Sequence, residues 1–264
     1  MSGRASGHGS EAFPMRRFFV EQIPSQGKTL VIRGLEAKHI TRVLRMGRGD
    51  RLILMDRKGA RFQAMITSTG GSEVSVILEK SLPQPPPSPV EITLCQALLR
   101  PHVMDYVIQK TSELGADSII PFFSERTVVG PGSDRGTKKL RHWQEVAQNA
   151  AKQSDRARPA TVGPLFAFGD LLARWKDEEA IKIILWEEEA ARDLKTFIRS
   201  SSPPERVVGL IGPEGGFSPK EIKIASEAGF LSASLGRRVL RAETAAVTLV
   251  AIIQYEWGDL SLKA

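Results

Sequence analysis

The sequence predicts an α/β protein of two domains, in which a small β-rich domain precedes a larger domain with a mostly parallel sheet. Three observations lead to this prediction. Residues 81–89 contain five prolines, and such a run continues neither a helix nor a central strand. Before this run the chain is rich in short strand-type segments, and after it strand-type and helix-type segments alternate. This alternation is typical of parallel strands covered by helices.

The N-terminal domain is expected over residues 15–80, where five segments have the composition of short strands. These segments are residues 17–20, 28–32, 51–55, 61–66 and 73–78. One helix is expected over residues 35–46, because apolar and basic side chains repeat there at helical spacing. Its apolar face holds Ile40, Val43 and Leu44, and its basic face holds Lys38, Arg42 and Arg45. Residues 1–14 are small, polar and without periodicity, so we expect a disordered extension.

Residues 81–89 are expected to form a stiff, extended linker, and residues 90–264 to form the C-terminal domain. Its strands are predicted at residues 90–94, 118–121, 181–186, 207–211 and 231–235. Its helices are predicted at residues 104–114, 138–153, 194–199, 219–228 and 243–257. Open α/β sheets bind their ligands outside the carboxyl ends of the strands, so the loops that follow these strands are the first candidates for a site.

Composition excludes several classes of protein. No apolar run approaches the ~20 residues that a membrane-spanning helix needs. The single cysteine, Cys95, cannot form an internal disulfide, and together with the absence of a secretory signal this indicates a reducing compartment, so we expect a cytoplasmic protein. The four histidines and one cysteine show no ligand-like spacing, which argues against a metal site.

Charge is distributed unevenly along the chain. Residues 15–80 carry 13 basic and 6 acidic side chains, a net charge of +7, whereas residues 90–264 carry 23 of each sign. All the net positive charge of the protein therefore lies in the N-terminal domain, which favours a polyanion such as RNA as its partner over an ordinary solvated surface. The candidate phosphate contacts are Arg16, Arg17, Lys38, Arg42, Arg45, Arg48, Arg51, Lys58 and Arg61.

A loop with three glycines joins the strand at 207–211 to the following helix. Ser218 suits the N-cap of that helix, Pro219 its first turn, and Glu221 completes a capping box. Glycines at this place let backbone amides approach a ligand closely, although a tight turn without a ligand would read in the same way. The chain has neither a Walker A motif nor G-x-G-x-x-G, so an ordinary nucleotide-triphosphate or dinucleotide site is not expected.

Two further loops follow predicted strands. Arg237, Arg238 and Arg241 follow the last strand, with Glu243 at the start of the next helix, and an acidic run at 187–189 follows the strand at 181–186. Taken alone, the first is a solvated basic turn with an acid favoured by the helix dipole, and the second is an exposed acidic turn. Because three such loops follow three candidate parallel strands, they are expected to converge at one edge of the sheet.

The residues of these loops resemble a known signature. The run I-G-P-E-G-G-F at 211–217, followed by L-G-R-R-V-L-R-A-E-T-A-A at 235–246, is similar to that of the RsmE family, SPOUT-class methyltransferases acting on a uridine of 16S ribosomal RNA. The resemblance spans nearly all of residues 15–260. Weaker matches lie at residues 15–19, 39–45, 110–115, 125–127 and 153–156.

The resemblance implies a PUA-like N-terminal β-barrel and a C-terminal SPOUT α/β domain with a deep trefoil knot. It also implies that the knot binds S-adenosylmethionine, and that the protein is a homodimer with its site near the subunit interface. The partner would be 16S ribosomal RNA or the small ribosomal subunit, with no membrane and no metal. Carried over, the cofactor-binding residues are Leu185, Trp186, Gly212, Pro213, Glu214, Gly215, Leu235, Gly236, Val239, Leu240 and Arg241.

The chain departs from the family pattern in two places. Arg100, Pro101 and His102 stand where a Lys-Gly pair is expected after the first strand of the knot domain. Residues 149–153 read N-A-A-K-Q in place of an acidic run, and Asp155 stands where glycine is common. We assign no role to these stretches from the resemblance, and the three cofactor loops are not affected.

The reaction implied by the resemblance joins a sulfonium methyl group to N3 of uracil, which is a poor nucleophile while protonated. Alignment of two bound reactants can supply ~7–11 kcal/mol, and a positioned base contributes about 10²–10⁴-fold. Arg241 is the candidate for steadying the uracil oxygens, and Glu243 or Glu214 for accepting the proton. Two alternatives stay open. They are a SPOUT methyltransferase with a different nucleotide or ribose target, and a non-catalytic RNA-binding ribosome-assembly protein with a vestigial cofactor pocket.

Overall fold

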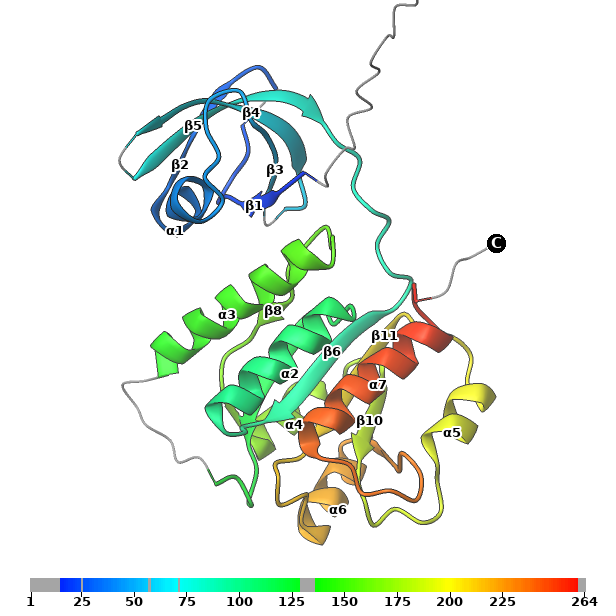
Figure 1. Ribbon diagram of the computed structural model, residues 1–264. Coiled ribbons are helices and arrows are strands. Elements are labelled where there is room, and N and C mark those ends of the chain that lie inside the picture. Colours follow the sequence, from blue (N-terminus) through cyan, green and yellow to red (C-terminus); the bar gives the residue numbers. More distant parts are fainter. Residues whose placement is uncertain (1–14, 25, 57, 71, 129–135, 261–264) are drawn as a thin grey trace, which may run out of the picture. The chain divides into compact units, whose positions relative to one another are not determined.

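The computed structural model describes residues 15–24, 26–56, 58–70, 72–128 and 136–260 (Figure 1). The chain divides into two compact units, Met1–Gln84 and Pro85–Ala264. The boundary between them falls inside the predicted linker at 81–89, although the last strand of the first unit continues to Ser81. The extension predicted for residues 1–14 lies outside the described residues.

The N-terminal unit is a mixed five-stranded sheet with one short helical segment. Its strands are β1 Arg17–Phe19, β2 Thr29–Arg33, β3 Arg51–Met55, β4 Arg61–Gly70 and β5 Glu73–Ser81. The sheet order is β1-β3-β4-β5-β2, in which β1 and β3 are parallel and the other pairs are antiparallel. In β5 alternate side chains are buried, which is the period of a strand with one face on a core.

The sheet encloses a core of its own. Phe18 from β1, Leu52 and Leu54 from β3, and Val76 from β5 are all buried in one apolar cluster. Ile40 closes this cluster from the helical segment and is fully buried. The predicted β-rich organisation of this unit is therefore confirmed.

The predicted helix at 35–46 is wrong in its extent and its regularity. It is a short α-helix, α1 Gly34–Lys38, that continues as one turn of π-helix, η1 His39–Val43. The wider turn is closed by a hydrogen bond from Leu44 N to His39 O at 3.0 Å. Because a π-turn shifts the phase of the side chains, Val43 faces solvent at 68% exposure and does not join the apolar face.

The C-terminal unit contains a seven-stranded sheet in which every pair is parallel. Its strands are β6 Glu91–Ala97, β7 Ser118–Phe123, β8 Thr161–Val162, β9 Phe166–Ala167, β10 Ile181–Leu185, β11 Arg206–Ile211 and β12 Leu231–Ala233. The order is β12-β10-β11-β6-β7-β8, and β9 also pairs with β7. The predicted parallel sheet is thus confirmed, with two short strands, β8 and β9, that were not predicted.

Helices cover both faces of this sheet. They are α2 Pro101–Glu113, α3 Gly136–Gln153, α4 Phe168–Trp175, α5 Leu194–Ser200, α6 Pro219–Glu227 and α7 Ala242–Glu256. Side chains of α2, α3, α5 and α7 share one buried cluster, and those of α4 and α6 share the other. Alternate strand residues serve the two layers: Leu94 packs into the first cluster and Cys95 into the second. Helices α2 and α7 lie side by side (Figure 1).

Among the helices of the described ranges, none is both long enough and apolar enough to cross a membrane.

Candidate functional site

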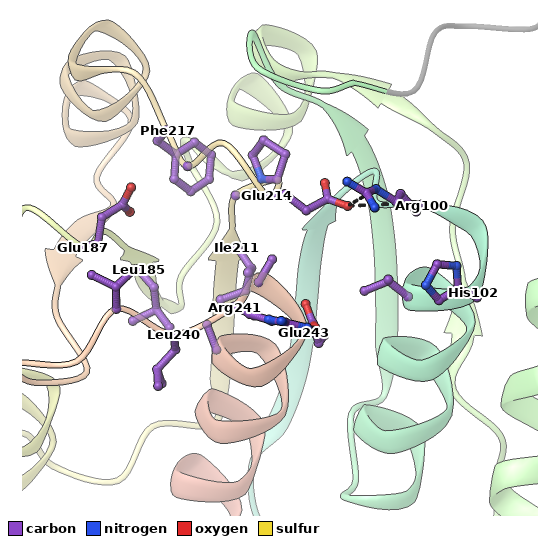
Figure 2. A pocket seen from close by; sticks show the side chains of 17 residues that line it. Arg100, His102, Leu185, Glu187, Ile211, Glu214, Phe217, Leu240, Arg241 and Glu243 are labelled. Carbon is purple, nitrogen blue, oxygen red and sulfur yellow. Dashed lines mark hydrogen bonds and ion pairs between the residues drawn. The ribbon is translucent and has the colours of Figure 1, made fainter.

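A cavity of about 420 Å³ opens at the carboxyl ends of strands β6, β10 and β11 (Figure 2). Its volume lies within the range of about 300–1,000 Å³ that is usual for small-molecule sites. All three predicted loops contribute to its wall, through Leu185, Glu214 and Arg241 among others. The prediction that these loops converge at one edge of the sheet is therefore confirmed.

The glycine-containing loop between β11 and α6 forms one side of the cavity. A hydrogen bond from Gly216 N to Pro213 O, at 3.0 Å, closes a tight turn. Gly216 has a φ of +68°, and a Cβ at this position would collide with the Glu187 carboxylate. The left-handed backbone favours glycine here, because other side chains are strained at this φ, whereas the Glu187 carboxylate is the end of an exposed, flexible side chain that could move aside.

The predicted capping box fixes where the loop ends and α6 begins. Ser218 N donates to Glu221 Oε2 at 2.9 Å, and Glu221 N donates to Ser218 Oγ at 3.3 Å. Both reciprocal bonds of the motif are present, and Pro219 occupies the first turn. The sequence signal for this helix start is therefore confirmed.

Two guanidinium–carboxylate pairs lie at the cavity (Figure 2). Arg241 Nη1 lies 3.9 Å from Glu243 Oε1 at the start of α7. On the other side, Glu214 Oε1 accepts a hydrogen bond from Arg100 N at 3.3 Å and lies 3.9 Å from Arg100 Nε. The cavity therefore presents charged groups of both signs, which suits a ligand that itself carries both.

The rest of the wall is apolar. Leu185, Ile211 and Phe217 line it and are almost fully buried. The Phe217 ring stacks on Phe122, with ring centroids 6.4 Å apart and an interplanar angle of 4°. This packing anchors Phe217, the last residue of the glycine loop before the N-cap of α6, in the buried core.

Most of the predicted cofactor and catalytic residues line the cavity, and four do not. Those that line it are Leu185, Gly212, Pro213, Glu214, Val239, Leu240, Arg241 and Glu243. Trp186 and Gly215 are not among the lining residues; Trp186 packs on the opposite face of the sheet, and Gly215 contacts Arg126. Leu235 and Gly236 border a second cavity of about 390 Å³ between α5 and α7.

Sequence reasoning also missed part of the wall. Arg100, His102 and Val103 follow strand β6 and line the cavity, although the departure from the family pattern left Arg100 and His102 without a role. The rule that selected the other loops would have found them, because β6 is a central parallel strand of the same sheet. Glu187 and Phe217 are further lining residues that were not predicted.

The predicted phosphate contacts of the N-terminal unit differ in their accessibility. The side chains of Arg16, Lys38, Arg42, Arg45, Arg48, Arg51 and Lys58 are exposed, and Arg17 is half-buried. Arg61 is only 8% exposed, so its burial contradicts the expected contact with phosphate. Arg51 is exposed but pairs with Glu79 at 3.0 Å, and the hydrogen bond from Arg51 lowers the pKa of the Glu79 carboxyl.

In the part of the chain that the structure describes, no group of three or more histidine, cysteine, aspartate or glutamate side chains is arranged so that it could hold a metal ion.

Comparison with known protein families agrees with this architecture. Residues 86–254 match the model of an RNA methyltransferase domain, and residues 32–79 match that of an RNA methyltransferase PUA domain. The fold and the site thus define a SPOUT-class RNA methyltransferase preceded by a PUA domain. The predicted fold class is confirmed at this level.

Similar proteins and solved structures identify the family within this class of methyltransferases. The chain is 30% identical to ribosomal RNA small subunit methyltransferase E of Bacillus subtilis, covering 92% of this chain and 97% of that one. The Neisseria gonorrhoeae methyltransferase E, solved bound to S-adenosylmethionine, is 32% identical with a TM-score of 0.85, covering 94% of this chain and 100% of that one. A Legionella pneumophila protein solved with the bound cofactor S-adenosylmethionine is 31% identical with a TM-score of 0.88, over the same shares of the two chains. The chain belongs to the ribosomal RNA small subunit methyltransferase E (RsmE) family, as its sequence motifs predicted.

Proposed function

We propose that this protein transfers a methyl group from S-adenosylmethionine to N3 of a uridine in 16S ribosomal RNA. The observation that carries the proposal is the convergence of the loops after β10, β11 and β12 on one cavity. Two relatives with the same fold were solved with S-adenosylmethionine bound. The name of the family supports ribosomal RNA of the small subunit as the substrate.

The residues of the cavity fit this cofactor. Leu185, Ile211 and Leu240 provide apolar surface for an adenine ring. Gly212 and Gly216 line the cavity and carry no side chain that would extend into it, so the main chain of the loop forms this part of the wall. The carboxylates suit the α-amino and sulfonium charges of the ligand, and the guanidinium groups suit its carboxylate and the uracil oxygens.

The catalytic roles are assigned from the charged pairs. When bound, S-adenosylmethionine supplies an electrophilic methyl group. Arg241 would hold the uracil oxygens, and a carboxylate would take the N3 proton. We favour Glu243 for this step over Glu214, because Glu214 already accepts the Arg100 N–H, while Glu243 lies beside Arg241 at the cavity.

The PUA domain would capture the RNA. Its exposed basic side chains carry the positive charge of the chain, and contacts to phosphates would fix the position of the RNA without reading its bases. Arg45 presents its side chain from a left-handed backbone conformation, with φ of 53°, directly after the π-turn. A left-handed backbone conformation at a residue other than glycine is uncommon, and so is a π-turn; both often mark functional segments.

The proposal extends to assembly and location. We infer that the protein acts in the cytoplasm as a homodimer, on free 16S ribosomal RNA or on the small subunit, and that the passage from β12 to α7 completes a trefoil knot. The knot is supported by topology, since β12 is an edge strand next to β10 while α7 packs over β11 and β6. A monomer in solution would contradict the inferred homodimer. A crystal structure in which the segment from β12 to α7 threads no loop would contradict the inferred knot.

Two measurements test the activity. Calorimetry should show that the protein binds S-adenosylhomocysteine, and the absence of binding would favour a non-catalytic ribosome-assembly protein. Mass spectrometry of digested ribosomal RNA from cells lacking the gene should show the loss of one 3-methyluridine, which returns when the gene is restored. Loss of a different modified nucleotide or of a ribose methyl group would assign another target.

A further inference from the structure

The segment 124–127, which follows β7, contacts the glycine loop of the cavity without lining the cavity itself. Arg126 Nη1 donates a hydrogen bond to Gly215 O at 3.0 Å. The two segments are also packed tightly against each other: a Cβ atom added at Gly215 would lie only 3.2 Å from Arg126 Cβ. The mechanism proposed above gives this segment no role.

The bond to Gly215 fixes one peptide plane of the loop. In a trans peptide the carbonyl of one residue and the N–H of the next point in opposite directions. With Gly215 O turned toward Arg126, Gly216 N–H points into the turn, where it donates to Pro213 O at 3.0 Å. Rotation of this peptide would break both hydrogen bonds, and glycines on both sides of it offer little steric resistance to such rotation.

Glu125, the residue before Arg126, holds the end of the same loop. Ser218 Oγ donates to Glu125 Oε2 at 2.8 Å, and Glu125 N donates to Glu221 Oε1 at 2.9 Å. Glu221 is buried and also completes the capping box of α6. Two adjacent residues therefore bind the loop at its middle and at its end.

The segment that makes these contacts is itself a closed turn. Ser124 N donates to Thr127 Oγ1 at 2.9 Å, and Thr127 N donates to Ser124 O at 3.1 Å. Glu125 and Arg126 are the two central residues of this turn, so their positions are fixed relative to the end of β7.

We propose that Arg126, supported by Glu125, is a positioning residue that holds the Gly215–Gly216 peptide in the orientation needed to bind the cofactor. The inference rests on the proposed function, because it concerns the same cavity. Arg126 does not line the cavity, so in this proposal it acts only through the shape of the loop between Gly212 and Phe217.

The test compares Arg126→Ala, Arg126→Lys and a matched control, Arg158→Ala, whose exposed side chain lies outside the cavity. The loss of a hydrogen bond from a charged group predicts that Arg126→Ala raises the Kd for S-adenosylhomocysteine about tenfold. The KM for S-adenosylmethionine should rise similarly, with kcat at saturation within about twofold of wild type. Arg126→Lys keeps one donor and should recover part of the affinity, while Arg158→Ala should match wild type.

Hydrogen exchange supplies a readout that does not depend on the ligand. Peptides covering residues 212–217 should exchange faster in Arg126→Ala than in wild type, with no change in peptides from α2 or α3. A variant with unchanged Kd and unchanged exchange overturns the inference, and so does one that exchanges faster throughout the unit, which would indicate a general loss of stability. A wild-type protein that fails to bind S-adenosylhomocysteine overturns the proposed function itself, whatever the exchange shows.

Discussion

Arg241 and Glu243 face each other across the first turn of α7, with Arg241 Nη1 3.9 Å from Glu243 Oε1. The guanidinium side chain is 86% exposed, whereas the carboxylate side chain is only 20% exposed. The pair thus has one end in the cavity wall and one end available to an incoming nucleotide. An ion pair with one partner in solvent adds little to stability, so a loss of the catalytic role proposed for Arg241 can be measured separately from an effect on folding.

Replacement of Arg241 by alanine is expected to remove most of the methyl transfer and leave the fold intact. Loss of a group that stabilises developing charge typically costs about 10²–10³-fold in kcat. Single-turnover methylation of 16S ribosomal RNA measures the effect, with the thermal midpoint measured in parallel. Arg238→Ala is the matched control, because Arg238 is exposed on the same loop but does not line the cavity. Unchanged turnover in Arg241→Ala would exclude this residue from the mechanism.

Binding of RNA by the PUA domain is expected to depend steeply on salt. Each phosphate contact contributes about 0.7–0.9 to the slope of log affinity against log salt, so Arg42→Ala should reduce the slope by about this amount. Arg51→Ala should change it less, because the Arg51 guanidinium already pairs with Glu79. Titration of a 16S ribosomal RNA transcript at several KCl concentrations measures both. Equal slopes for wild type and Arg42→Ala would remove this residue from the interface.

The sequence predicted the central strands of the C-terminal sheet because each is a continuous apolar run between turn signals. Two-residue strands such as β8 and β9 carry no such signal; they pair with β7, which they follow along the chain. Helix α4 was also missed. Its N-cap, Ala167, accepts no hydrogen bond through its side chain, whereas the shorter α5 begins after Asp193, whose side chain accepts from Thr196 N.

The site shows a similar limit. The rule that ligands bind at the carboxyl ends of parallel strands located the cavity, but not which side chains turn into it. Leu185 and Glu187 line the cavity, while Trp186 between them packs on the opposite face. In an extended chain, successive side chains point to opposite sides. Had this rule been applied to the loop after β10, the predicted cavity residues would have included Glu187 in place of Trp186. The second cavity beside Leu235 depends on how α5 and α7 pack, which local sequence does not reveal.

Gln254 is expected to be the most sensitive polar residue of α7. Its buried amide donates to Gly115 O at 3.2 Å and accepts from Ser88 Oγ and Asp259 N, each at 3.1 Å. Gln254→Leu would leave the Ser88 hydroxyl and the Asp259 N–H without this acceptor, at a cost of about 1–3 kcal/mol, whereas Gly115 O would keep its hydrogen bond from Arg156 Nη2 at 3.3 Å. Denaturant unfolding measures it through fluorescence, since all four tryptophans lie in the C-terminal unit.

The control for that variant is Gln109→Leu, which changes the same residue type on the exposed side of α2. Substitutions on such a surface usually stay within about 0.5 kcal/mol of wild type. If the two variants unfold at the same denaturant concentration, the hydrogen bonds of Gln254 contribute nothing to stability.

Cys95 gives a prediction that depends on pH. It lies in β6, is fully buried, and burial raises the pKa of its thiol from 9.0 to about 12. Because the thiolate is the reactive form, the native protein at pH 8 should resist a thiol-specific disulfide reagent, whereas the unfolded chain in urea should react at once. Rapid stoichiometric labelling of the native protein at pH 8 would show that this strand opens readily.

The same thiol should couple stability to alkaline pH. Between pH 9 and about 12 the folded thiol keeps its proton while the unfolded thiol ionises, so the unfolded state binds fewer protons and stability falls as the pH rises through this window. Cys95→Ala removes the titrating group, and its cavity lowers stability at every pH. The difference in unfolding free energy between wild type and Cys95→Ala should therefore be largest near pH 8 and shrink toward pH 10.5. A difference that stays constant over this range would mean that the thiol has the same pKa in both states, and so that burial in β6 does not hold it protonated.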